Sequence, residues 1–103
     1  MNHSISVILE FLCNHYGVSP CMVISANRSD KYMRIRQMLV LLAGKCKDDI
    51  IADQLKRSEE DVRYLRRTGL GNMRFDRELR NEIEVLKVKL LLFEIESLIH
   101  CDA

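Results

Sequence analysis

The chain of 103 residues has no long uninterrupted apolar run, and its first residues contain no Lys or Arg. Glu10 interrupts the only apolar stretch near the N-terminus. A membrane-spanning helix needs about 20 consecutive apolar residues, and a signal peptide needs a basic segment before its apolar core. We therefore expect a cytoplasmic protein that has neither a signal peptide nor a membrane span.

Cysteine is present but shows no pairing pattern. The spacings match neither a disulfide framework nor a paired metal-ligand motif, and thiols within apolar stretches are typical of a reducing compartment. His15 beside Cys13 and His100 beside Cys101 would make a metal site only if the chain ends met, so we expect a buried thiol and a terminal tail instead. No metal and no cofactor are predicted. The four cysteines are Cys13, Cys21, Cys46 and Cys101.

The sequence also lacks internal repeats, low-complexity tracts and strand-like alternation. No serine, cysteine or carboxylate pair has a basic partner at a recognisable catalytic spacing, so an enzyme is not expected. Apolar residues make up 48% of the chain, enough for one domain to bury a core without disulfides or metal. We predict a single all-α domain over residues 1–103.

Helical periodicity and end signals divide this domain into segments. One helix is expected at 4–16, with Ser4 as its cap and Gly17 as its end, and Pro20 opens a short second helix. A loop at 27–32 precedes a central helix at 33–43 that closes near Gly44. Residues 68–72 are predicted to break the chain before a long helix at 76–99 whose N-cap is Asp76.

The stretch 49–69 has the pattern of two short helices joined by a tight turn at Lys56-Arg57-Ser58. The Ser58 hydroxyl is a candidate cap for the second helix. Val62 and Leu65 give this helix an inward face and leave its arginines outside. This pattern predicts a helix-turn-helix and hence a reader of double-stranded DNA.

Charge is unevenly distributed, although the net charge is only +1. Residues 1–75 carry twelve Lys and Arg against eight Asp and Glu, whereas residues 76–103 carry four against seven. The cluster from Arg28 to Arg36 is offset locally only by Asp30, which suits phosphate contacts. For the arginines of the second helix, the other interpretation is a solvated face in which Glu59 pairs with Arg63.

These segments together resemble the C-terminal DNA-binding domain of the bacterial chromosomal replication initiator DnaA. The matching stretches are Tyr16-Gly17-Val18-Ser19, Ile24-Ser25-Ala26-Asn27-Arg28-Ser29, Arg34-Ile35-Arg36-Gln37-Met38, and Ile51 to Leu55 leading to Val62. The similarity spans about residues 8–65, and the helix from Asp76 to Leu86 is similar to the family's last helix. The resemblance implies the same helical fold and double-stranded DNA as the partner.

The resemblance also implies individual roles. Arg28 corresponds to the arginine that enters the minor groove, where a narrow A·T-rich segment attracts positive charge. Arg34 and Arg36 correspond to backbone contacts, and Arg57 corresponds to the arginine of the family's base-reading signature. The family's Asp-His-Thr triplet is replaced here by Ser58-Glu59-Glu60, so its base readout does not carry over, although a carboxylate can read cytosine N4.

The nucleotide-binding pattern Gly-x-x-x-x-Gly-Lys-Ser/Thr is absent, so no ATPase activity is expected. The sequence predicts a bacterial or phage DNA-binding regulator of transcription or replication. The alternative is a protein-interaction module of the same fold that has lost DNA binding, with a replication or transcription protein as partner. The predicted DNA contacts are Arg28, Lys31, Arg34, Arg36, Gln37, Lys56, Arg57, Ser58, Glu59, Arg63, Arg66 and Arg67.

The last helix has more apolar surface than one small domain needs to cover its core. Leu79, Ile83 and the apolar residues that follow them step by four and three, which is the spacing of a helix that packs lengthwise on another. A surplus apolar face implies a partner, and we expect a homodimer. The predicted contacts are Leu86, Leu90, Leu91, Phe93, Ile95 and Leu98.

Overall fold

The computed structural model describes residues 5–101, with the side chains of 97–101 left outside the description. Within this range the chain contains helices and no strand, which confirms the all-α prediction. The predicted cap Ser4 lies outside the described residues. The helices are α1 (Ile5–Tyr16), α2 (Pro20–Val23), α3 (Asp30–Ala43), α4 (Asp48–Leu55), α5 (Glu59–Phe75) and α6 (Arg77–Cys101).

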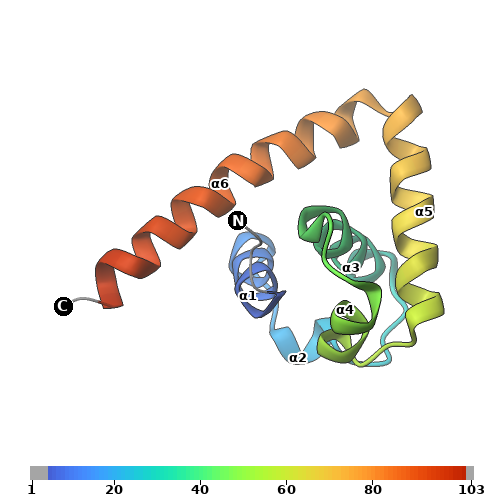
Figure 1. The fold of residues 1–103 in the computed structure, drawn as a ribbon, viewed down its shortest axis with the longest axis horizontal. Coiled ribbons are helices and arrows are strands. Elements are labelled where there is room, and N and C mark those ends of the chain that lie inside the picture. Colours follow the sequence, from blue (N-terminus) through green and yellow to red (C-terminus); the bar gives the residue numbers. More distant parts are fainter. Residues whose placement is uncertain (1–4, 102–103) are drawn as a thin grey trace.

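Helix α3 is the centre of the molecule, and α1, α2, α5 and α6 all pack against it. The two longest helices, α5 and α6, meet at Asp76 and enclose the shorter helices between them (Figure 1). Ile35, Met38 and Leu39 of α3 are at most 2% exposed. Burying such side chains stabilises the fold by about 1.5–3 kcal/mol each, so the central helix anchors the core.

Several helix ends are formed as the sequence predicts. Gly17 has φ of +66°, the left-handed conformation that ends α1. Pro20 occupies the first turn of α2. The Ser58 hydroxyl accepts a hydrogen bond from the Asp61 backbone N–H at 3.2 Å, and Asp76 Oδ1 accepts one from the Leu79 N–H at 3.0 Å. The predicted caps of α5 and α6 are therefore confirmed.

Two predicted irregular segments are helical in part or throughout. The loop expected at 27–32 ends early, because α3 already begins at Asp30. The break expected at 68–72 is wrong, since α5 continues through it to Phe75. Gly69 is buried there, and a Cβ atom at this position would lie 3.0 Å from Leu41 Cδ2 of α3. Close packing between α3 and α5 thus overrides the low helix propensity of glycine.

One apolar stripe of α6 covers the core. Leu79, Ile83, Leu86 and Leu90 are at most 4% exposed, so the prediction that Leu86 and Leu90 form a dimer contact is wrong: these side chains are used within the chain. Phe93 is partly buried and its ring lies 5.7 Å from that of Phe11 in α1.

The other predicted dimer contacts are placed differently. Leu91 and Ile95 are each 52% exposed, whereas the Leu98 side chain lies outside the described residues. Among the helices of the described chain, none has the length and apolar content to cross a membrane.

Candidate nucleic-acid interface

The loop between α2 and α3 is held by its own polar side chains. The Ser25 hydroxyl donates to the Met22 carbonyl at 2.6 Å and accepts from the Asn27 N–H at 3.2 Å. Asn27 Oδ1 in turn accepts from the Ser29 N–H at 2.8 Å. Such local bonds restrict the backbone to one turn geometry. Arg28 is therefore an exposed side chain on an ordered loop.

Arg36 anchors this loop to α3 and is not a DNA contact. Its side chain is 1% exposed, and it donates to the Val23 carbonyl at 2.6 Å and the Ser25 carbonyl at 2.9 Å. Burial lowers the pKa of the Arg36 guanidinium, and the nearby charge of Arg57 lowers it further. The predicted backbone contact is wrong because every strong donor of Arg36 points into the protein.

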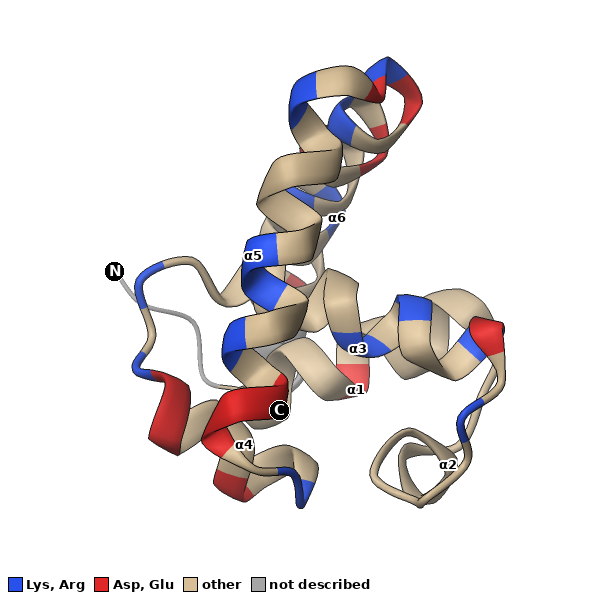
Figure 2. Cartoon of the chain, turned by 90° about the vertical axis from the view of Figure 1, so that its right-hand side faces the viewer, with Lys and Arg blue, Asp and Glu red and all other residues tan. Residues whose placement is uncertain are grey.

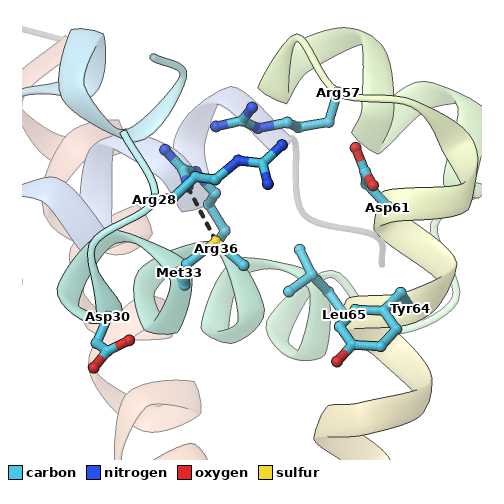
Figure 3. Close-up of a pocket in the computed structure, with 8 residues that line it drawn as sticks. All are labelled: Arg28, Asp30, Met33, Arg36, Arg57, Asp61, Tyr64 and Leu65. Carbon is cyan, nitrogen blue, oxygen red and sulfur yellow. Dashed lines mark hydrogen bonds between the residues drawn. The ribbon is translucent and has the colours of Figure 1, made fainter. Parts of the chain in front are cut away.

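Arg57, from the turn between α4 and α5, also donates to the Ser25 carbonyl. Two guanidinium groups from different parts of the chain thus share one acceptor, and the Arg28 side chain lies beside them (Figure 3). These arginines line a cavity of about 470 Å³ whose other wall is formed by α5. Within the described chain, no carboxylate forms an ion pair with any of the three. Asp30 and Asp61 also line this cavity, so its lining combines three guanidinium groups with two carboxylates and keeps a small excess of positive charge, which favours an anionic group such as phosphate.

A second basic surface runs along α5. Arg63, Arg67 and Arg74 are exposed on the outward side of this helix, with Leu70 on the turn between Arg67 and Arg74, and they line part of a groove of about 550 Å³. Basic positions recur along the length of α5 in Figure 2. None of these three arginines has an ion-pair partner in the described part of the chain. The ion pair between Glu59 and Arg63, which was the other interpretation of this helix face, is therefore not formed. We refer to Arg63, Arg67 and Arg74 as the α5 arginine stripe.

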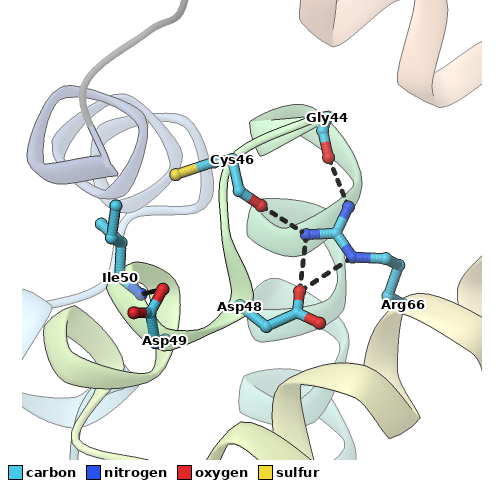
Figure 4. A network of polar contacts seen from close by, with 6 residues as sticks. All are labelled: Gly44, Cys46, Asp48, Asp49, Ile50 and Arg66. Carbon is cyan, nitrogen blue, oxygen red and sulfur yellow. Dashed lines mark hydrogen bonds and ion pairs between the residues drawn. The ribbon is translucent and has the colours of Figure 1, made fainter.

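Arg66 lies next to this stripe but faces the protein. It bonds to Asp48 Oδ1 through Nε at 3.1 Å and Nη2 at 3.0 Å, and it donates to the carbonyls of Gly44 and Cys46 (Figure 4). Its side chain is 24% exposed. Arg66 also lines the groove beside the stripe, but its guanidinium is engaged within the chain and fixes α5 against the connection between α3 and α4.

Arg34 likewise has a partner on another helix. Its Nη2 lies 2.6 Å from Glu82 Oε2, and the Tyr16 hydroxyl donates to Glu82 Oε1 at 2.8 Å. The Glu82 hydrogen bond raises the pKa of Arg34, while burial and then this same carboxylate raise the pKa of Tyr16. The trio connects α1, α3 and α6, and the structure does not bring Arg34 into the Arg28 cluster.

The remaining predicted contacts fall into two groups. The Gln37 amide is directed at the Leu65 carbonyl, 3.4 Å away, which places it between α3 and α5. Lys31 is exposed in the first turn of α3, with its ammonium 5.9 Å from the Tyr32 ring centroid. Lys56 is exposed and adopts a left-handed conformation with φ of 56° at the end of α4. Lys31 and Lys56 therefore remain accessible, whereas Gln37 serves the core.

Acidic residues occupy the start of α5. Glu59, Glu60 and Asp61 form its first turn, where their negative charge stabilises the helix by interacting with the positive end of its dipole. Asp48 and Asp49 begin α4 close by, and red segments accordingly gather at the lower end of Figure 2. The first turn of α5 is therefore negatively charged, whereas exposed arginines follow it from Arg63 to Arg74.

Comparisons with known proteins add no family to this description. A scan against protein-family models found no match, and a search of curated proteins found no significant relative.

Proposed function

We propose that the protein binds double-stranded DNA and regulates transcription or replication, with α4, the turn at 56–58 and α5 acting as a helix-turn-helix. The observation that carries this proposal is the set of arginines without carboxylate partners in the described chain: Arg28 and Arg57 at the cavity, and the α5 arginine stripe. The sequence resemblance to the initiator's DNA-binding domain also supports the proposal that this protein binds DNA.

The packing of α5 explains why its arginines are available. Val62, Leu65 and Gly69 are buried against the rest of the domain, so Arg63 and Arg67 lie on the outward side. A helix whose inner face is fixed in this way presents a rigid outer face, as the second helix of a helix-turn-helix does in the major groove. Arg28, on its braced loop, then reaches the flanking phosphates or the minor groove.

The acidic first turn determines how α5 approaches DNA. Glu59 and Glu60 lie where the helix-turn-helix normally contacts base edges, and their charge repels the phosphates that border the groove. In the major groove a carboxylate accepts a hydrogen bond from cytosine N4 or adenine N6, but from no thymine or guanine edge. We therefore expect a site that has cytosine or adenine opposite this turn and differs from the initiator box.

The first test is fluorescence anisotropy of labelled duplexes, using an A·T-rich initiator-type box and a pool of random genomic fragments at two salt concentrations. Arg28→Ala and Arg67→Ala are each expected to weaken binding and to reduce the salt slope by about one unit. Lys87→Ala is the matched control, because Lys87 is exposed on α6 away from both basic surfaces. Absence of binding at low salt, or an equal loss in the control, would contradict the proposal.

The second candidate is a protein-interaction module, and it is favoured by the apolar residues that α6 exposes. Under this alternative, Arg28→Ala and Arg67→Ala leave the activity of the protein unchanged. Leu91→Asp or Ile95→Asp instead abolishes complex formation with a replication or transcription protein. A pull-down with purified candidate partners, in parallel with the anisotropy titration, separates the two functions.

A further inference from the structure

Helix α6 carries a second apolar stripe on the side opposite its core-facing stripe. The core-facing residues Leu79, Ile83, Leu86 and Leu90 are at most 4% exposed. Because each residue turns the helix by about 100°, a second set of side chains lies about half a turn away from them. These side chains are 50–58% exposed, and we call them the outer seam: Val85, Val88, Leu91, Leu92 and Ile95.

The outer seam has the spacing of a helix-pairing surface. Val85, Val88, Leu92 and Ile95 step by three, four and three residues, which matches the two apolar positions of a heptad. Together with Leu91 they place five apolar side chains, each at least half exposed, on one side of the helix, and a grouped apolar patch of this kind is often an interaction site. In Figure 1, α6 runs along the outside of the molecule and its C-terminal part extends beyond α1, which leaves this helix accessible.

We propose that the outer seam binds the outer seam of a second copy of this chain, with the two α6 helices parallel. The charged residues that flank the seam select this occupant and this orientation. Glu84, which in the single chain forms an exposed ion pair with Lys87 at 3.3 Å, precedes Val85 on one side of the seam, and Lys89 follows Val88 on the other. In a parallel pair, such flanking positions of opposite helices face each other, so Glu84 of each copy meets Lys89 of the other.

The antiparallel arrangement lacks this complementarity. When Val88 is placed opposite Leu92 so that the same apolar residues overlap, Lys89 of one copy comes close to Lys89 of the other. Like charges beside an apolar seam disfavour pairing, whereas two symmetric Glu84 to Lys89 contacts favour it. The charge pattern therefore distinguishes a parallel dimer from its antiparallel alternative.

Pairing on this face does not require α6 to fold first. Leu86 and Leu90 already hold the helix on its own domain, so a seam of about two heptads need not offset the cost of ordering a helix. Two copies joined in parallel are related by a twofold axis along α6, and each retains its own α5 arginine stripe. The pairing is independent of the proposed DNA binding and is tested without DNA.

Sedimentation of the purified full chain measures the pairing directly. We expect a species of twice the 12.0 kDa chain mass, and we expect Leu92→Glu to convert it to a monomer with unchanged helical circular dichroism. Leu70→Glu on α5 is the matched control, because Leu70 is 53% exposed but lies outside the seam; this variant is expected to stay dimeric. A monomer at concentrations up to about 1 mM, or a dimer that Leu92→Glu does not affect, would overturn the proposal.

Charge exchange tests the flanking contacts. Glu84→Lys and Lys89→Glu are each expected to weaken the dimer about tenfold, which corresponds to about 1.4 kcal/mol. Because the double variant restores both contacts with their signs reversed, its dissociation constant is expected to return close to that of the original chain. If the double variant is weaker than either single variant, the parallel contacts do not exist.

Disulfide cross-linking tests the orientation, in a background where Cys21, Cys46 and Cys101 are replaced by serine. Identical seam positions face each other in a parallel pair, so Val88→Cys alone is expected to form an intermolecular disulfide under mild oxidation. An antiparallel pair gives the opposite pattern, since Val88→Cys then cross-links only when mixed with Leu92→Cys. The second pattern would refute the parallel arrangement.

Discussion

Replacing Arg36 by methionine separates the structural role of this arginine from a role in DNA binding. The substitution keeps an unbranched apolar stem, shortens the side chain by two atoms, and removes its hydrogen bonds to the Val23 carbonyl at 2.6 Å and the Ser25 carbonyl at 2.9 Å. A hydrogen bond to a charged group contributes about 1.5–3 kcal/mol. The cost of burying the guanidinium is recovered in part, so we expect a net loss of about 3 kcal/mol in the free energy of unfolding.

Urea unfolding followed by circular dichroism measures this loss. Arg28→Met is the matched control, since Arg28 is exposed on the same loop and its replacement is expected to change stability by less than about 0.5 kcal/mol. If the proposed DNA binding is correct, the order reverses in an affinity measurement, since Arg28→Met is expected to lower the affinity of a fully folded protein. An Arg36→Met variant as stable as the control would refute the assignment of Arg36 as the anchor of the loop.

Three further predictions follow from the packing. Gly71→Ala is expected to stabilise the protein by about 0.5–1 kcal/mol, because the added methyl group meets open space in a helix. Gly69→Ala is expected to cost about 1 kcal/mol, because its Cβ would lie 3.0 Å from an α3 side chain. Equal unfolding midpoints for the two variants would contradict this difference. Leu90→Ala is expected to lower the free energy of unfolding by about 2–5 kcal/mol. Leu92→Ala, measured on dilute monomer, is expected to lower it by less than about 0.5 kcal/mol. Similar losses for the two variants in thermal unfolding would show that the two faces of α6 are wrongly assigned. Tyr16 has a raised pKa in the folded chain, so the phenol ionises first in the unfolded state and stability is lost as pH rises above about 10. Unfolding titrations are expected to show that the free energy of unfolding of the original chain exceeds that of Tyr16→Phe by less and less above that pH. A difference that stays constant with pH would contradict this prediction.

Local end signals were the part of the fold that the sequence predicted well. Gly17, Pro20, Ser58 and Asp76 each act through their own backbone or through a neighbour within three residues. Such signals depend on no distant contact and are therefore readable from the chain. The predicted break at 68–72 failed for the opposite reason, because the contact of α5 with α3 lies far away in sequence.

The arginines show the same division between local and distant information. Spacing predicted correctly that Arg63 and Arg67 lie on the outer side of α5. It did not separate them from Arg66, whose partners in the connection between α3 and α4 are 18–22 residues away. Arg36 is a similar case, because a buried arginine and an exposed arginine look the same in the sequence. Only the carbonyls that folding brings close to the guanidinium distinguish them.

The way Arg36 holds its loop has a consequence for redesigning the proposed DNA-binding loop. Its acceptors are main-chain carbonyls, those of Val23 and Ser25, so the anchor itself uses no side chain of the loop. The buried Val23 side chain and the Ser25 and Asn27 side chains that hold the turn must be kept. A library built at the exposed position 28 would therefore sample new ligand preferences on an unchanged scaffold.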